Sequence, residues 1–195
     1  MIALLAALSA SAAAGMRLAT PLLMIGLLQR DDLWSKIPLL CHIPPTVLLC
    51  ILTSWSLFEL FASKKLLGQR ILQIFQLILS PIVGAIMGIT VAEAADAPIQ
   101  FLWIIGIVGG LLALVIQLVL VGWFYRLKGL PLWVVFIEDI LCIVLVIFAF
   151  DAPPQGGIIA LILLWLAIRS SKQWHSWYVG ENQAQKPAKH YHKPD

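Results

Sequence analysis

The sequence predicts an all-α protein: a polytopic membrane helix bundle of about six transmembrane helices, with both termini on the cytoplasmic side. Three observations predict this fold class. The 195-residue chain is 61% hydrophobic and 12% charged, with a mean hydropathy of +0.95, whereas about a quarter of the residues in soluble domains are charged. Its apolar residues gather in segments close to the ~20 residues that cross a bilayer. Its Lys and Arg residues are unevenly distributed between the connections.

The first three apolar segments each carry a feature that shapes the predicted helix. Residues Ile2–Leu28 are expected to form one helix. Residues Ile37–Phe61 contain Pro44-Pro45, which donate no backbone hydrogen bond and are expected to break or bend the early part. Residues Ile71–Ala92 contain Ser80-Pro81, where we expect a kink because the proline removes a backbone bond that the serine hydroxyl partly replaces.

The last three segments differ in how well they match the thickness of a bilayer. Residues Pro98–Tyr125 and Pro131–Phe150 are long enough to span, and the second begins with a proline, a favourable first-turn residue. The apolar core of the sixth, Ile158–Ile168, rises only ~16 Å, about half of the hydrocarbon thickness. It spans only if Arg169 and Lys172 extend their charged groups to the interface.

The loop charges orient this six-span arrangement. Ten of the 13 Lys and Arg residues fall on one side, whereas only Arg30 and Lys36 fall on the other. The ten are Lys64, Lys65, Arg70, Arg126, Lys128, Arg169, Lys172, Lys186, Lys189 and Lys193. Because cytoplasmic loops are rich in Lys and Arg, both termini are predicted to be cytoplasmic. This distribution also explains the net charge of +3, so nucleic-acid binding is not expected.

We expect one transmembrane domain over residues 1–178 and a polar, disordered tail over residues 179–195. The start of the chain resembles a secretory signal with small-residue cleavage sites. It lacks a basic region before the apolar run, which resumes at Leu18. We therefore expect this segment to be retained as the first helix.

The sequence offers no strong metal or catalytic motif. Cys41, Cys50 and Cys142 lie within predicted spans without a short paired spacing, so they are interpreted as small apolar core residues. His190 and His192 lie in the polar tail and lack supporting ligands. There is also no nucleophile–base set or phosphate loop, so we expect neither a cofactor nor enzymatic activity.

Small residues in three segments predict close helix packing. In lipid, glycines allow helix backbones to approach and gain dispersion contacts. We expect this packing inside one subunit, with a dimerisation interface or a glycine-flexed gate as alternatives. The candidate packing residues are Gly15, Gly84, Gly88, Gly106, Gly109 and Gly110.

Charged residues inside the apolar segments form the candidate functional site. Arg17 lies in the first segment, and Glu138-Asp139 in the fifth. Intramembrane charges are costly and are usually paired or hydrated, so we predict that Arg17 pairs with this acidic couple. The two acids diverge by about 100° around a helix, so one partner cannot easily satisfy both. The second carboxyl is protonated, hydrated in a cavity or close to the inner interface. Gln117 is a neutral neighbour, and Glu59 is expected to pair locally with Lys64 and Lys65.

Four segments together carry a family resemblance. They are residues 8–17, with their run of small residues before Arg17, residues 54–59, residues 79–85 and residues 136–139. In this order they resemble segments of the DUF4126 membrane proteins, in their cyanobacterial branch, over about residues 8–172. The resemblance implies a multi-span protein of the plasma (inner) or thylakoid membrane. It implies no established activity.

Two functions compete on these residues. In the first, the intramembrane charges line a polar pathway of a small channel or transporter for an ion, a proton or a small polar solute. In the second, the charges form a sealed network, and the protein is a non-enzymatic scaffold or assembly factor for other membrane proteins. The expected partners are the lipid bilayer and either a second copy of the chain or another membrane protein.

Overall fold

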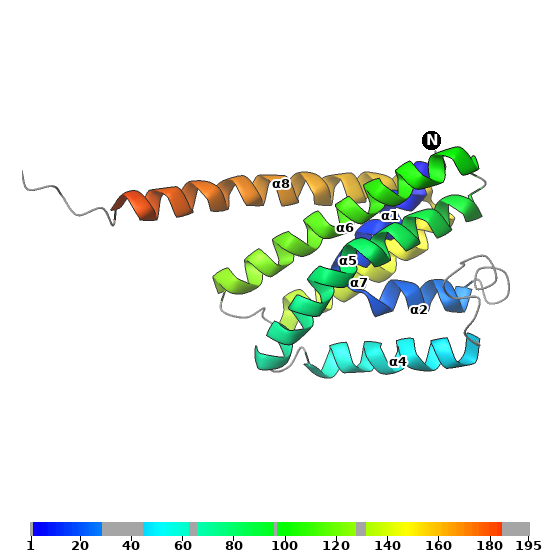
Figure 1. Cartoon of the computed structure of the whole chain (residues 1–195), viewed down its shortest axis with the longest axis horizontal. Coiled ribbons are helices and arrows are strands. Elements are labelled where there is room, and N and C mark those ends of the chain that lie inside the picture. Colours follow the sequence, from blue (N-terminus) through cyan, green and yellow to red (C-terminus); the bar gives the residue numbers. More distant parts are fainter. Residues whose placement is uncertain (1, 29–44, 63–65, 96, 128–131, 185–195) are drawn as a thin grey trace, which may run out of the picture.

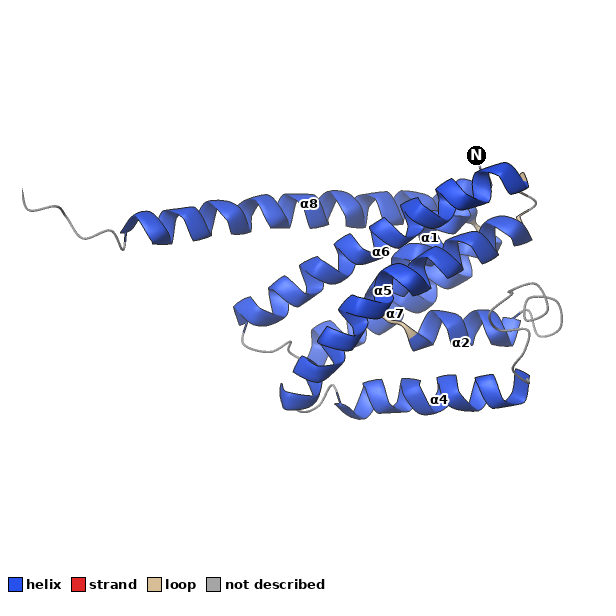
Figure 2. Ribbon diagram, in the orientation of Figure 1, coloured by secondary structure: helices blue, strands red, loops and turns tan. Residues whose placement is uncertain are grey.

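Every element in the part of the chain that the structure describes is an α-helix (Figure 2). The computed structural model describes residues 2–28, 45–62, 66–95, 97–127 and 132–184. The helices, labelled as in Figure 1, are α1 (Ile2–Met16), α2 (Ala19–Leu28), α4 (Pro45–Ala62), α5 (Leu66–Ala94), α6 (Ile99–Leu127), α7 (Leu132–Asp151) and α8 (Pro153–Ala184).

Four of these helices are long and apolar enough to cross a membrane. The spanning stretches are Arg70–Ala94, Ile99–Arg126, Trp133–Asp151 and Pro153–Ser171. Their outward-facing side chains include many large hydrophobic residues, such as Ile78, Trp103 and Ile140. Such surfaces suit a hydrocarbon environment, where exposed apolar side chains carry no cost. The chain is therefore compatible with a membrane protein.

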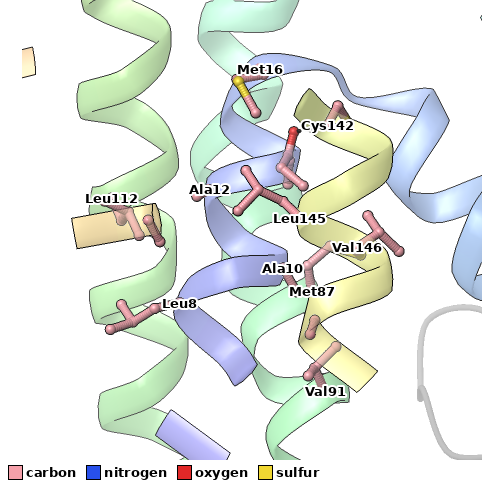
Figure 3. Close-up of a cluster of buried hydrophobic side chains, with 14 of the residues drawn as sticks. Leu8, Ala10, Ala12, Met16, Met87, Val91, Leu112, Cys142, Leu145 and Val146 are labelled. Carbon is pink, nitrogen blue, oxygen red and sulfur yellow. Dashed lines mark hydrogen bonds between the residues drawn. The ribbon is translucent and has the colours of Figure 1, made fainter. Parts of the chain in front are cut away.

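Helix α1 is the centre of the bundle. It packs against α5, α6, α7 and α8, and all residues from Ala6 to Met16 are buried. Figure 3 shows its core side chains between Leu112 of α6 and Leu145 and Val146 of α7. This central position requires the small side chains of residues 9–15, because a helix with bulky residues on every side could not be enclosed so closely.

Two serines of α1 bind the backbones of neighbouring helices. The Ser9 hydroxyl donates a hydrogen bond of 2.7 Å to the Leu145 carbonyl. The Ser11 hydroxyl donates one of 2.9 Å to the Gly84 carbonyl. In an apolar interior these bonds satisfy the hydroxyl groups and hold α1 against α7 and α5.

The first apolar segment is not one helix, so the prediction for residues 2–28 is wrong in this respect. Helix α1 ends at Met16, and α2 begins at Ala19. Pro21 provides the physical reason, because a proline cannot bond to the carbonyl four residues earlier, and its ring clashes with that carbonyl. The carbonyl in question belongs to Arg17. The chain turns at this point, and α2 runs back beside α4 and α7 (Figures 1 and 3).

The start of α1 lies at the end of the bundle that contains the α5–α6 connection and the start of α8. Its residue Ala7 clusters with Ala92 and Ile105, on either side of the α5–α6 connection. Leu5 lies against Gly157 at the start of α8. Figure 1 shows α8 ending at the opposite end of the bundle. The prediction that both termini share one side depended on a single crossing by residues 2–28, and the break at Arg17 removes that basis.

Three further segments differ in detail from expectation. Helix α5 continues through Pro81, as a kinked helix would, but among the described residues the buried Ser80 hydroxyl has no hydrogen-bond partner, so the expected compensation for the proline is not seen. Helix α4 begins at Pro45, and Pro44 lies outside the described residues. The sixth segment, expected to be marginal, is the long helix α8, which continues past residue 178 to Ala184.

Candidate functional site

Five polar side chains from different elements meet inside the bundle. They form what we call the polar layer: Arg17 from the α1–α2 turn, Glu59 from α4, Gln76 from α5, Gln117 from α6 and Asp139 from α7. Glu59 and Gln117 are each only 2% exposed. Arg17 lies within electrostatic range of Glu138, Asp139 and Glu59. The break in the first segment thus places a cation among side chains contributed by four helices.

Arg17 and Asp139 form the ion pair at the centre of this layer. The Arg17 Nε atom lies 2.7 Å from Asp139 Oδ1, and the two side chains are 7% and 27% exposed. The Nε–H bond is not directed at the oxygen, so the contact is a close ion pair without a well-aligned hydrogen bond. A guanidinium carries five N–H donors. The structure therefore leaves Arg17 with donor capacity that this contact does not use.

Glu59 belongs to a chain of hydrogen bonds that crosses three helices. Its Oε1 atom accepts bonds from Trp55 Nε1 at 2.9 Å and from Gln76 Nε2 at 3.3 Å. Gln117 Nε2 in turn donates to Gln76 Oε1 at 3.4 Å. The predicted partners, Lys64 and Lys65, lie outside the described residues. Gln117 was predicted to neighbour Arg17, and its described partner is Gln76.

Glu138 faces a different environment from Asp139. It lines a groove of about 530 Å³ between α6, α7 and α8. Within the described part of the chain, no hydrogen bond or ion pair reaches its carboxylate. Consecutive residues on a helix point about 100° apart, and the close contact with Arg17 is made by Asp139. Glu138 lies within electrostatic range of Arg17 without a close contact.

Helix α5 carries two buried oxygen atoms without partners near the polar layer. Within the described residues, Gln73 Oε1 accepts no hydrogen bond, and Ser80 Oγ neither donates nor accepts one. Buried polar atoms are rarely left unpaired, so these positions suit bound water or a polar ligand. Sequence reasoning missed Gln73 and Gln76, although the spacing of residues 73, 76 and 80 puts all three on one face of an apolar helix.

The predicted packing glycines lie at helix contacts inside the subunit. A Cβ atom on Gly15 would lie 2.8 Å from the Ala113 backbone of α6, and one on Gly88 would lie 2.8 Å from the Ser11 hydroxyl. The other four, Gly84, Gly106, Gly109 and Gly110, lie where α5 and α6 pack together. Larger residues would separate α1, α5 and α6.

The cysteines occupy two kinds of position. Cys142 is buried, and its thiol donates a weak hydrogen bond of 3.6 Å to the Ala13 carbonyl. Cys50 is exposed on α4, whereas core burial was predicted, and Cys41 lies outside the described residues. Among the described side chains, no three His, Cys, Asp or Glu residues group as a metal site requires.

Comparison with known families identifies where this chain belongs. The family described as "Domain of unknown function (DUF4126)" matches residues 4–173. The chain belongs to the DUF4126 family. No curated protein and no solved structure matches it. In this DUF4126 protein the matched region includes every residue of the polar layer, so the site lies within the family domain.

Proposed function

We propose that this DUF4126 protein is a membrane transport protein: a small channel or transporter that passes an ion, a proton or a small polar solute through the polar layer. The observation that carries the proposal is the break of the first apolar segment at Arg17. Non-helical backbone at membrane depth is tolerated only where protein surrounds it or where it lines a water-filled cavity. Broken helices with charged residues at the break form the binding sites of many transporters.

The charge balance of the site also favours transport. Glu59, Glu138 and Asp139 surround one guanidinium, so the carboxyl groups outnumber the cation. A sealed structural network would be expected to match its charges, because an unpaired buried ion is costly. The surplus acidic groups and the unpaired oxygens of Gln73 and Ser80 provide ligands for a cation, a proton or water.

The arrangement also suggests a revised topology. In this proposal α4 to α8 cross the membrane, whereas α1 and α2 enter from the outer face and return to it. The basic ends of α5, α6 and α8 are then cytoplasmic, as the Lys and Arg distribution requires. The start of α1 lies outside, and the end of α8 lies inside. We place the protein in the plasma (inner) membrane or the thylakoid membrane.

The scaffold alternative receives less support. It needs small-residue helix faces that are free to bind other membrane proteins. The six glycines in question pack against α1, α5 and α6 within the subunit. A reproducible partner recovered by gentle detergent extraction, together with no flux of any solute, would favour the scaffold role over transport.

Flux in liposomes tests the proposal. The purified chain is reconstituted, and uptake of protons, K⁺, Cl⁻ and glycerol is compared with that of protein-free vesicles. We expect flux of at least one solute, and we expect Asp139→Asn and Glu59→Gln to reduce it at least tenfold because both remove charge from the polar layer. Glu93→Gln, at an exposed position on α5, is the matched control and should leave the flux unchanged.

Thermal unfolding of each variant establishes that the loss is not a loss of fold. Protein-dependent flux that survives both substitutions would contradict a pathway through the polar layer. The absence of flux for all four solutes would contradict the transport role itself.

A further inference from the structure

A groove opens on the side of the bundle next to Glu138. We call it the lateral groove, and it lies between α6, α7 and α8, with Met16 at the end of α1 also in its lining. Its volume is about 530 Å³, within the range of about 300–1,000 Å³ for small-molecule sites. Most of its lining is aliphatic, including Ile116, Leu141 and Leu163. Such walls suit the apolar body of a ligand.

Glu138 places a carboxylate in this apolar setting. Among the described residues, no hydrogen bond or close ion pair reaches it. The guanidinium of Arg17 lies within electrostatic range of Glu138, but its close contact is with Asp139. A carboxylate surrounded by aliphatic walls is strongly stabilised by a cation that enters the same space. A hydrated inorganic ion would gain few oxygen ligands from these walls. An organic cation would use both the charge and the apolar lining.

An aromatic and a basic side chain also line the groove. Trp123 lines the groove, and its indole nitrogen donates a hydrogen bond of 2.8 Å to the Ser170 hydroxyl of α8. This bond links α6 to α8, and the indole face can attract an organic cation. Arg169 also lines the groove. Its guanidinium lies over the Trp165 ring, 5.3 Å from the ring centroid, so its charge already has an aromatic partner.

We propose that the lateral groove binds an amphiphilic organic cation, which reaches Glu138 from the hydrocarbon side of the bundle. The cationic centre lies against the Glu138 carboxylate, and the apolar body lies along the aliphatic walls. This site adjoins the polar layer, because Glu138 lies within electrostatic range of Arg17, but the proposal does not depend on transport of a solute. Binding is measured at equilibrium and therefore fails or succeeds independently of flux.

Two ions of matched shape and opposite charge test the proposal. Equilibrium binding of radiolabelled tetraphenylphosphonium and tetraphenylborate is measured on the purified full chain in an uncharged maltoside detergent. We expect saturable binding of the cation and at least tenfold weaker binding of the anion. Glu138→Gln should weaken cation binding at least tenfold, and Glu93→Gln, outside the groove, should not change it.

A second variant tests the groove without removing the charge. Leu166 lines the groove and is partly exposed, so Leu166→Trp should fill it and weaken binding at least tenfold with Glu138 intact. Thermal unfolding and gel filtration establish that each variant is folded. If Glu138→Gln does not fold, Leu166→Trp decides the outcome. Equal binding of the two probes, or undiminished cation binding in the folded variants, would overturn the proposal.

Discussion

At the scale of single residues, the neighbouring acids Glu138 and Asp139 have different surroundings. Asp139 meets Arg17 at 2.7 Å, whereas Glu138 lines an apolar groove. One helix position, or about 100° of rotation, separates them. Asp139 therefore makes the close contact with Arg17, whereas Glu138 lines the groove and still lies within electrostatic range of Arg17.

Two buried serines give a residue-scale prediction. Ser11→Ala removes the hydrogen bond to the Gly84 carbonyl, so we expect it to lower the free energy of unfolding by about 1 kcal/mol. Ser80→Ala removes a buried hydroxyl without a described partner. We therefore expect Ser80→Ala to be neutral or to stabilise the fold by up to about 1 kcal/mol.

Reversible unfolding in SDS mixed micelles measures the change in the free energy of unfolding for each serine variant. Each serine serves as the control for the other, because both are fully buried and the same atom is removed. If Ser80→Ala lowers the free energy of unfolding as much as Ser11→Ala does, the prediction is wrong, and the Ser80 hydroxyl has a hydrogen-bond partner in the membrane, such as bound water.

At the scale of helices, small residues decide which elements can approach. Helix α6 carries Gly110, whose added Cβ would lie 2.7 Å from the Pro81 carbonyl oxygen of α5. The same helix carries Gly122, which has nothing within 4 Å of an added Cβ. Gly110 is thus required by packing, whereas Gly122 on the same helix is not.

This contrast predicts opposite effects of the same substitution. Gly110→Ala forces α5 and α6 apart, and we expect a loss of about 2 kcal/mol in the free energy of unfolding. Gly122→Ala adds a better helix former in open space, and we expect a change between zero and a gain of about 1 kcal/mol. Unfolding in mixed micelles checks both, and a tolerated Gly110→Ala would contradict the close contact.

At the scale of the whole molecule, the break at Arg17 is the basis of the proposed topology. A single helix over residues 2–28 would carry the chain across the membrane once. In the proposed topology, two shorter helices with a turn between them return the chain to the face from which it entered. The connections after residue 28 then keep the sides that the Lys and Arg distribution assigns, and only the start of the chain changes side.

Cysteine labelling in intact cells tests this topology. In a background where the three native cysteines are replaced, exposed positions on either face receive one cysteine each. We expect Ile2→Cys and Asp151→Cys to react with a membrane-impermeant maleimide added outside. Arg126→Cys should react only after permeabilisation. If Ile2→Cys also requires permeabilisation, the first segment crosses the membrane and the proposed return of α2 is wrong.

Much of the fold was predictable from local properties of the chain. The bounds expected for the third, fourth and fifth segments lie within a few residues of those of α5, α6 and α7, because apolar segments and their polar ends are local features. The break in the first segment also has a local signal, since Pro21 follows Arg17 by four residues. It was missed because a continuous apolar run outweighed that single residue.

Composition and segment length were sufficient to predict a chain of apolar helices compatible with a membrane protein and to identify Arg17, Glu138 and Asp139 as unusual charges. The tertiary structure alone decided which acid meets Arg17, and that Glu59, Gln76 and Gln117 form one chain. The physical reason is that hydropathy is a property of each segment. A pairing between side chains depends on the rotation and height of helices far apart in sequence, which only their packing determines.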